Sequence, residues 1–298
     1  MSKVIAYHKN GIGNLIMYTP ALQAIAQAYD TEIDVCVPEW QDGRREPCIE
    51  ILRACPFVNE VVDEPAKSYD RWFYTEHTEY GEVFDIFSNH QKRLLTSPNW
   101  LQMGIHETEY YMRHARAFGY KGKTPKQYCP VKEFDTGMDS GRLKIGLCNG
   151  YFKVDMWTRK AYPHFAELSY NLKNWFDCDI VKVGMPEELD NVECDYDFTG
   201  KLSITETAYV ISQLDLFVTT DTGNMHIGDA LEIPMIALFG ATLTSKNKPL
   251  SKKSHVLTAG LPCVPCQCRE RFNKCRDYEC MKKLYVGDVM SLSRKILA

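Results

Sequence analysis

The second half of the chain alternates short apolar runs with stretches in which apolar residues recur at helical spacing. The apolar runs predict strands at Leu143–Cys148, Asp179–Val183, Leu216–Thr219 and Met235–Phe239. The helical spacing predicts helices at Pro163–Trp175, Ile204–Gln213 and Gly223–Leu231. Because successive parallel strands need a crossover connection, this alternation predicts an α/β domain built around a parallel sheet.

The first half begins in the same way, with a strand, a glycine-containing turn and a helix. Strands are predicted at Lys3–Tyr7, Ile33–Val37, Val58–Val62 and Phe84–Phe87, and helices at Thr19–Tyr29, Cys48–Ala54 and Glu107–Phe118. A last helix is predicted at Val286–Leu297. The polar stretch KEFDTGMDSGR, residues 132–142, is typical of a linker. We therefore expect two α/β domains, residues 1–141 and 142–298, with a cleft between their sheets.

Length and charge narrow the class of protein. The 298 residues suffice for two domains. A formal net charge of -4 gives no overall attraction to nucleic acid or to an anionic membrane. No apolar run approaches the roughly 20 residues that a membrane-spanning helix needs. The start of the chain, MSKVIAYHKNGIGN, is typical of a strand and a turn rather than of a signal peptide. We therefore expect a cytosolic protein.

The turn after the predicted strand Leu216–Thr219 is a candidate phosphate site. Open α/β sheets bind ligands beyond the carboxyl ends of their strands, and a helix N-terminus favours an anion. Asp221, Thr222 and Gly223 lie at that place. Gly223 permits close approach of the backbone, Thr222 offers a hydroxyl, and His226 could donate to a phosphate or a sugar. The alternative is that Asp221 or Thr222 only caps the helix and that His226 is structural.

The segment that starts at Asp221, DTGNMHIGDALEIPMIALFGAT, resembles the signature of glycosyltransferase family nine, which includes the ADP-heptose:lipopolysaccharide heptosyltransferases. Three further blocks resemble the family in the same order: NGIGNLIMYTPALQAI, FTGKLSITETAYVISQLDLFVTTDTG and CVPCQCRERFNKCRDYECM. The resemblance is weakest over residues 41–130. It implies a GT-B fold, in which two Rossmann-like domains face each other across a cleft. The N-terminal domain would bind the acceptor and the C-terminal domain the nucleotide-sugar, and transfer would need no metal.

The resemblance also implies site residues in the second domain. The loop WTRKAYP resembles the family's Lys-x-Trp-Pro loop, with Tyr162 in place of the tryptophan. This places Lys160 at the donor diphosphate with Arg159 as support, since a cation beside the leaving group stabilises its charge. The alternative is a pair of solvated loop cations. Glu187 in VGMPEE is expected to bind a ribose diol, and the alternative there is an exposed acidic loop.

The turn after the first strand departs from the family pattern. Gly11 and Gly13 would let the donor sugar or the acceptor approach the backbone. The family carries its proposed general base, an Asp, where this chain has Asn14, and an amide cannot take a proton at neutral pH. We count Asn14 and Asp42 with Lys160 as candidate catalytic residues. Three explanations stay open: another carboxylate (Glu39, Asp42 or Glu46), His8, or no strong base.

Five of the twelve cysteines lie between Cys263 and Cys280. A Cys-x-x-Cys pair followed by further cysteines is typical of a structural zinc site, with ligands at Cys263, Cys266, Cys275 and Cys280. The alternative is a reduced, packed loop. Basic residues in the same loop leave contact with nucleic acid as a weaker possibility.

Together these features predict a metal-independent, inverting glycosyltransferase. It would move a heptose or hexose from a nucleoside-diphosphate donor to a hydroxyl of a glycan or lipopolysaccharide. One alternative is transfer to a modified base in DNA. The other is a non-catalytic protein that binds a nucleotide or glycan. Asn14 favours the non-catalytic alternative, whereas Lys160 and the Asp221–His226 turn argue against it.

Overall fold

The chain divides into two compact units, Met1–Pro130 and Val131–Ala298. The computed structural model describes residues 4–39, 43–64, 71–74, 104–117, 119–150, 155–267, 269, 272 and 274–298. The backbone amide of Lys132 donates to the carbonyl of Thr205 over 3.0 Å. The ring centroids of Phe134 and Tyr209 lie 5.9 Å apart. Much of the expected linker thus packs on the second unit, and the division lies before the boundary suggested at residue 141.

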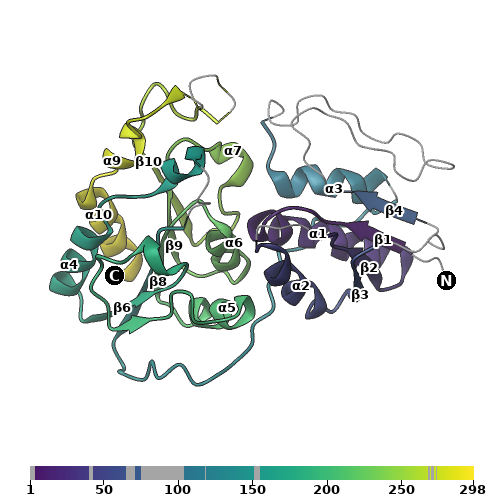
Figure 1. Ribbon diagram of the computed structural model, residues 1–298, viewed down its shortest axis with the longest axis horizontal. Helices are drawn as coiled ribbons and strands as arrows, with labels where there is room; N and C mark the ends of the chain where they lie inside the picture. Colours follow the sequence, from purple (N-terminus) through teal and green to yellow (C-terminus); the bar gives the residue numbers. More distant parts are fainter. Residues whose placement is uncertain are drawn as a thin grey trace. The chain divides into compact units, whose positions relative to one another are not determined.

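The second unit is built on a six-stranded parallel sheet (Figure 1). Its strands are β5 (Leu143–Cys148), β6 (Cys178–Lys182), β7 (Tyr196–Asp197), β8 (Leu216–Thr220), β9 (Met235–Phe239) and β10 (Ser254–Thr258). The order is β10-β9-β8-β5-β6-β7. Strands β6 and β7 are thus added on one side of β5, and β8, β9 and β10 on the other, so the strand order reverses between β5 and β8. Every residue of β6, β8 and β9 is buried. Burial on both faces explains why β9 is a continuous apolar run. The reversal point is where such sheets bind ligands.

Helices cover both faces of this sheet. They are α4 (Phe165–Trp175), α5 (Ile204–Ser212), α6 (Gly223–Ala230), α7 (Thr244–Asn247), α9 (Glu279–Lys282) and α10 (Val286–Leu297), with 3₁₀ turns η2 (Asp155–Lys160) and η3 (Pro186–Glu188). Figure 1 shows the pair α4 and α10 on one side of the strands and the pair α5 and α6 on the other. Leu168 and Leu172 of α4 and Val289 of α10 pack in the core against the sheet. The strands and helices expected for this half are confirmed, with β7 and β10 added at the edges.

The first unit has a parallel sheet of order β3-β2-β1-β4 among the described residues. The strands are β1 (Val4–Tyr7), β2 (Ile33–Cys36), β3 (Val58–Val62) and β4 (Arg71–Tyr74), and the helices are α1 (Ile12–Tyr29), α2 (Arg45–Arg53) and α3 (Glu107–Ala117). α1 packs against both α2 and α3. The strand expected at residues 84–87 lies outside the described residues. No helix in the described part of the chain is long and apolar enough to cross a bilayer.

Helix α1 begins at Ile12, well before the start expected at Thr19, and it runs through Pro20. A proline inside a helix has no amide hydrogen for the carbonyl four residues earlier. Here the hydroxyl of Thr19 donates to that carbonyl, the oxygen of Ile16, over 2.7 Å. This contact offsets the loss, so the helix continues in both directions from the proline. Its first turn consequently includes Asn14.

Replacing Gly184 tests whether the loop after β6 requires a glycine at this position. Gly184 has φ +120°, and an added Cβ would lie 2.6 Å from Oε2 of Glu188. We expect Gly184→Ala to lower the free energy of unfolding by about 1–3 kcal/mol, because the backbone is strained and the carboxylate must move. Urea unfolding followed by circular dichroism measures the change. Gly287→Ala is the control, since it lies in helix α10 with no atom within 4 Å of the added Cβ. Equal losses in both variants would contradict the prediction.

Candidate functional site

The carboxyl ends of β5 and β8 meet at the reversal point of the sheet. The hydroxyl of Thr220, the last residue of β8, donates to the carbonyl of Gly150 over 2.9 Å. A Cβ at Gly150 would lie 2.8 Å from Cγ2 of Thr222. The loop after β5 and the turn after β8 therefore pack against each other, and glycine at position 150 allows that approach.

Asn149 joins a third segment to these two. Its amide Nδ2 donates to the carbonyls of Tyr162 (3.1 Å) and Glu188 (3.2 Å), and its Oδ1 accepts from the backbone amide of Tyr162 (2.7 Å). Asn149 is buried. One side chain thus fixes the backbone after η2 and the backbone of η3 next to the end of β5. Lys160, the last residue of η2, is positioned by this arrangement.

The turn after β8 caps helix α6. Thr222 has extended backbone angles and is the N-cap residue, and its Oγ1 accepts from the amide of Met225 over 3.4 Å. The capping role considered for Thr222 is therefore confirmed. The amides of Gly223 and Asn224 open the helix, where no earlier helical carbonyl can accept from them. Such amides are suited to an anionic ligand.

A buried ion pair lies beside this helix terminus. Nζ of Lys160 donates to the carboxylate Oδ2 of Asp221 and to the backbone carbonyl of Asp221, both over 3.0 Å. Asp221 is 3% exposed, and the Lys160 side chain is 17% exposed. Nε2 of His226 lies 4.0 Å from Oδ1 of Asp221. Nζ of Lys160 also lies 4.8 Å from the ring centroid of Trp157, within range of a cation–π contact.

The charge of Asp221 is maintained by its neighbours. Burial acts to raise the pKa of this carboxyl, but the charges of Lys160 and His226 and hydrogen bonds from Lys160 and Thr242 lower it more. The resulting pKa lies below the ordinary value of 3.8. At neutral pH Asp221 is thus a carboxylate that holds the Lys160 ammonium in place. The structure brings together Lys160, Asp221, Thr222, Gly223 and His226.

The side chains of Arg159 and Glu187 have surroundings different from those of Lys160. The buried guanidinium of Arg159 lies 5.5 Å from the ring centroid of Phe272 and borders a different cavity. Glu187 is exposed in η3. Its neighbour Glu188 is buried, and its Oε2 accepts from the amide of Met185 over 3.0 Å. The donor contacts expected of Arg159 and Glu187 stay predictions.

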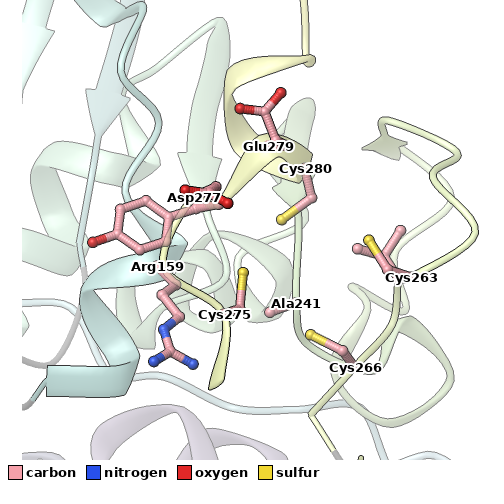
Figure 2. Close-up of a pocket in the computed structure, with 10 residues that line it drawn as sticks. Arg159, Ala241, Cys263, Cys266, Cys275, Asp277, Glu279 and Cys280 are labelled. Carbon is pink, nitrogen blue, oxygen red and sulfur yellow. The ribbon is translucent and has the colours of Figure 1, made fainter. Parts of the chain in front are cut away.

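The cysteine-rich loop encloses a cavity of about 60 Å³. Figure 2 shows its lining, which includes Arg159 and the thiols of Cys263, Cys266, Cys275 and Cys280. All four are free thiols. Burial, with the nearby Cys266, Cys275 and Cys263, raises the pKa of Cys280 to about 11. Among the described residues, no three His, Cys, Asp or Glu side chains form a ready metal site. Zinc binding by these cysteines stays a prediction.

In the first unit, the turn after β1 leads directly into helix α1. Gly11 is the N-cap of that helix, and Gly13 and Asn14 lie in its first turn. Nδ2 of Asn14 donates to Oε1 of Glu107 over 2.5 Å. Glu107 is fully buried at the start of α3. No local pattern in the sequence indicates a site role for Glu107, because an acid that opens a helix is ordinarily interpreted as a helix-terminus charge.

The other candidate bases differ in accessibility. His8 is fully buried, with Nε2 2.9 Å from the carbonyl of Asn10. Glu39 is exposed. Glu46 is exposed and pairs with the guanidinium of Arg45 at 2.9 Å. Asp42 lies outside the described residues. The general base therefore stays unassigned among these groups.

The comparisons with known proteins agree on one family. Residues 91–276, more than half of the chain, match glycosyltransferase family 9 (heptosyltransferase). The chain is 22% identical over 315 residues to lipopolysaccharide heptosyltransferase 2 of Salmonella typhimurium, covering 86% of this chain and 87% of that protein. A shorter match, 35% identical over 141 residues, is to lipooligosaccharide heptosyltransferase 2 of Haemophilus influenzae and covers 43% of this chain and 40% of that protein.

Solved structures share the fold. A family 9 glycosyltransferase from Veillonella parvula superposes with a TM-score of 0.74 at 16% identity, covering 99% of this chain and 97% of that one. The ADP-heptose LPS heptosyltransferase II of E. coli gives 0.66 at 19% identity, with 99% and 98% covered. An iron-containing dodecameric glycosyltransferase of enterotoxigenic E. coli gives 0.70 at 12% identity, with 99% and 76% covered. The two parallel α/β units thus have the GT-B fold, and the chain belongs to glycosyltransferase family 9, the heptosyltransferase family.

Proposed function

We propose that this glycosyltransferase uses the turn after β8 to bind the diphosphate of a nucleotide-sugar and transfers the sugar to a hydroxyl acceptor. The observation that carries the proposal is the Lys160 ammonium, held by the buried carboxylate of Asp221 at the N-terminus of α6. The amides of Gly223 and Asn224, with His226 one turn further, supply hydrogen bonds to the phosphates. Asp221 orients Lys160 in this proposal and does not itself bind the donor.

In this proposal these residues stabilise the diphosphate as it leaves the sugar. The acceptor oxygen forms a bond to the anomeric carbon, and the bond from that carbon to the phosphate oxygen breaks. The bonding electron pair stays with the diphosphate, and the hydroxyl proton is lost to a base or to water. Lys160 and the end of α6 offset the negative charge that develops, which is work that a divalent metal ion does in other transferases. A single displacement of this kind inverts the anomeric centre and needs no added metal.

The donor and acceptor are proposed from the relatives. Two of them are named as heptosyltransferases of lipopolysaccharide or lipooligosaccharide, and a solved relative as an ADP-heptose enzyme. We propose an activated heptose or hexose as the donor and a lipopolysaccharide or other glycan as the acceptor. Asn14, which departs from the family's Asp, leaves open the identity of the sugar and of the base. It also keeps a nucleotide-binding protein without catalysis as the alternative.

Removing the Lys160 ammonium should slow transfer. With the donor selected from a panel of nucleoside-diphosphate sugars by thermal stabilisation, we expect Lys160→Ala to reduce the rate of sugar transfer by about two orders of magnitude or more. The rate is measured as release of nucleoside diphosphate without added metal. The reason is the loss of a fixed positive charge beside the leaving group.

Lys173→Ala is the matched control for this experiment. Lys173 also forms a lysine–aspartate pair, with Asp195 at 2.9 Å, but it lies on the surface of α4. Its replacement should leave transfer unchanged. An unchanged rate in Lys160→Ala would remove Lys160 from the site, and stabilisation by a nucleotide with no turnover in the unaltered protein would support the non-catalytic alternative.

The Asp221 carboxylate should make stability depend on pH in a defined direction. Its pKa is lower in the folded chain than the ordinary 3.8, so its stabilisation is complete above about pH 4 and is lost as the pH falls through the folded value. We expect Asp221→Asn to cost about 1.5–3 kcal/mol at pH 7, because the Lys160 ammonium loses a charged partner. Urea unfolding between pH 7 and pH 3 should show the gap to the unaltered protein closing on acidification. A gap that is constant with pH would contradict this assignment.

We also propose that the cysteine cavity takes up one structural zinc ion. The support is chemical: four thiols border one cavity, and four thiolates satisfy tetrahedral zinc. Uptake requires the sulfur atoms to draw closer together. Metal analysis of protein purified under reducing conditions should find about one zinc per chain, and Cys266→Ser with Cys280→Ser should lose it. Cys194→Ser, at a half-exposed cysteine outside the loop, is the control. A metal-free protein that is unchanged by added zinc would show a packed, reduced loop instead.

A further inference from the structure

A buried carboxylate lies behind the turn that follows β1. Glu107 opens helix α3 and has 0% of its surface exposed. A buried carboxylate is costly unless hydrogen-bond donors surround it. Two of its donors contact the same oxygen, Oε1: Nδ2 of Asn14 at 2.5 Å and the hydroxyl of Tyr111 at 2.6 Å. Glu107 thus connects helix α3 to the first turn of α1.

The surroundings of Glu107 are those of a helix interface. Tyr111 and Tyr18 are both buried, and their ring centroids lie 5.0 Å apart between α3 and α1. The ring of His8 stacks on Tyr18 at 6.2 Å with the planes 16° apart. An apolar side chain at position 107 would satisfy such packing at a smaller cost than an acid. The acid is therefore better explained by what it does to Asn14.

A carboxylate can accept hydrogen bonds but cannot donate them, so it selects one of the two orientations of the Asn14 amide. The amide nitrogen faces Glu107, and the oxygen Oδ1 faces the other way. A Cβ built on Gly11 would lie 3.9 Å from that oxygen, so Oδ1 is on the side of the glycine turn. Asn14 as a whole residue is partly exposed, and the guanidinium of Arg44 lies 3.7 Å from the same built Cβ. The turn consequently presents a hydrogen-bond acceptor with a fixed direction.

We propose that Glu107 is a positioning residue for the acceptor substrate. Through the amide of Asn14, it holds Oδ1 where the acceptor hydroxyl donates its hydrogen, so that a lone pair of the hydroxyl oxygen is free to attack. This inference rests on the proposed transferase function. Asn14 orients the hydroxyl and takes no proton, since an amide is not a base at neutral pH.

The contact between Asn14 and Glu107 also explains why position 14 carries an amide rather than an acid. An aspartate there would place a second carboxylate against Glu107, and two carboxylates at hydrogen-bond distance cannot both ionise near neutral pH. Asn14 and Glu107 are therefore complementary, and changing one alters what the other position tolerates.

A stability cycle tests the contact without any substrate. Asn14→Asp should lower the urea midpoint at pH 7 and recover part of the loss on acidification, when one carboxyl of the pair is protonated. The double variant Asn14→Asp with Glu107→Gln should recover most of the loss at pH 7, because the new amide can donate to the new carboxylate. Additive effects of the two changes would overturn the contact between these side chains.

Kinetics test the positioning. Glu107→Gln keeps the shape of the side chain but allows the Asn14 amide to rotate by about 180°. Transfer to the acceptor should therefore fall about tenfold, while donor hydrolysis without acceptor stays unchanged. The double variant should regain transfer and should lose it at low pH, where the new carboxylate is protonated. Glu109→Gln, two residues further along α3 at a partly exposed acid, is the control.

The outcomes separate this inference from the proposed function. Unchanged acceptor transfer in Glu107→Gln, with the unaltered protein active, would overturn the positioning role alone. No turnover of any donor by the unaltered protein would overturn the transferase function, and the positioning role with it. A tenfold loss confined to acceptor transfer, with the double variant rescued, would support both.

Discussion

The ion pair between Lys160 and Asp221 is the interaction on which the second unit's site depends. A carboxylate that is almost fully buried is costly to remove from water, and it is tolerated because an ammonium and a helix N-terminus lie against it. The ion pair therefore forms only when three segments lie next to one another: the end of β8, the first turn of α6 and the end of η2. The apolar core beneath the sheet and the hydrogen bonds of Asn149 keep them there.

Burial is complete in the central strands that the sequence pattern indicates most clearly. Strands β8 and β9 are fully buried, so β9 is continuously apolar, β8 begins with three apolar residues, and both are easily identified. The edge strands β7 and β10 are only partly buried and carry no such signal. The early start of α1 was missed for a different reason. A proline suits the first turn of a helix better than its interior, and only the contact of Thr19 with the carbonyl of Ile16 shows why the helix extends before Pro20.

The candidate site was predicted as separate residues but not as contacts. Lys160 and Asp221 were both named, yet their pairing spans 61 positions of the chain and leaves no trace in either local pattern. Arg159 was grouped with Lys160 because they are adjacent. In a 3₁₀ turn, neighbouring side chains point about 120° apart, and here one contacts Asp221 while the other borders the cysteine cavity. Glu107 lies 93 positions from Asn14, so only the folded chain reveals it.

The three hydrogen bonds of Asn149 have a consequence for which positions of this chain can vary. They fix the main chain of two loops, at Tyr162 and Glu188, without using the outward-facing side chains of either loop. Glu187, at the exposed tip of η3, can therefore be exchanged while the backbone that carries Lys160 stays in place. The exposed side chains of η3 and the position of the Lys160 ammonium are therefore set by different contacts. A single buried asparagine thereby allows the surface residues of both loops to vary while the backbone beneath them is kept.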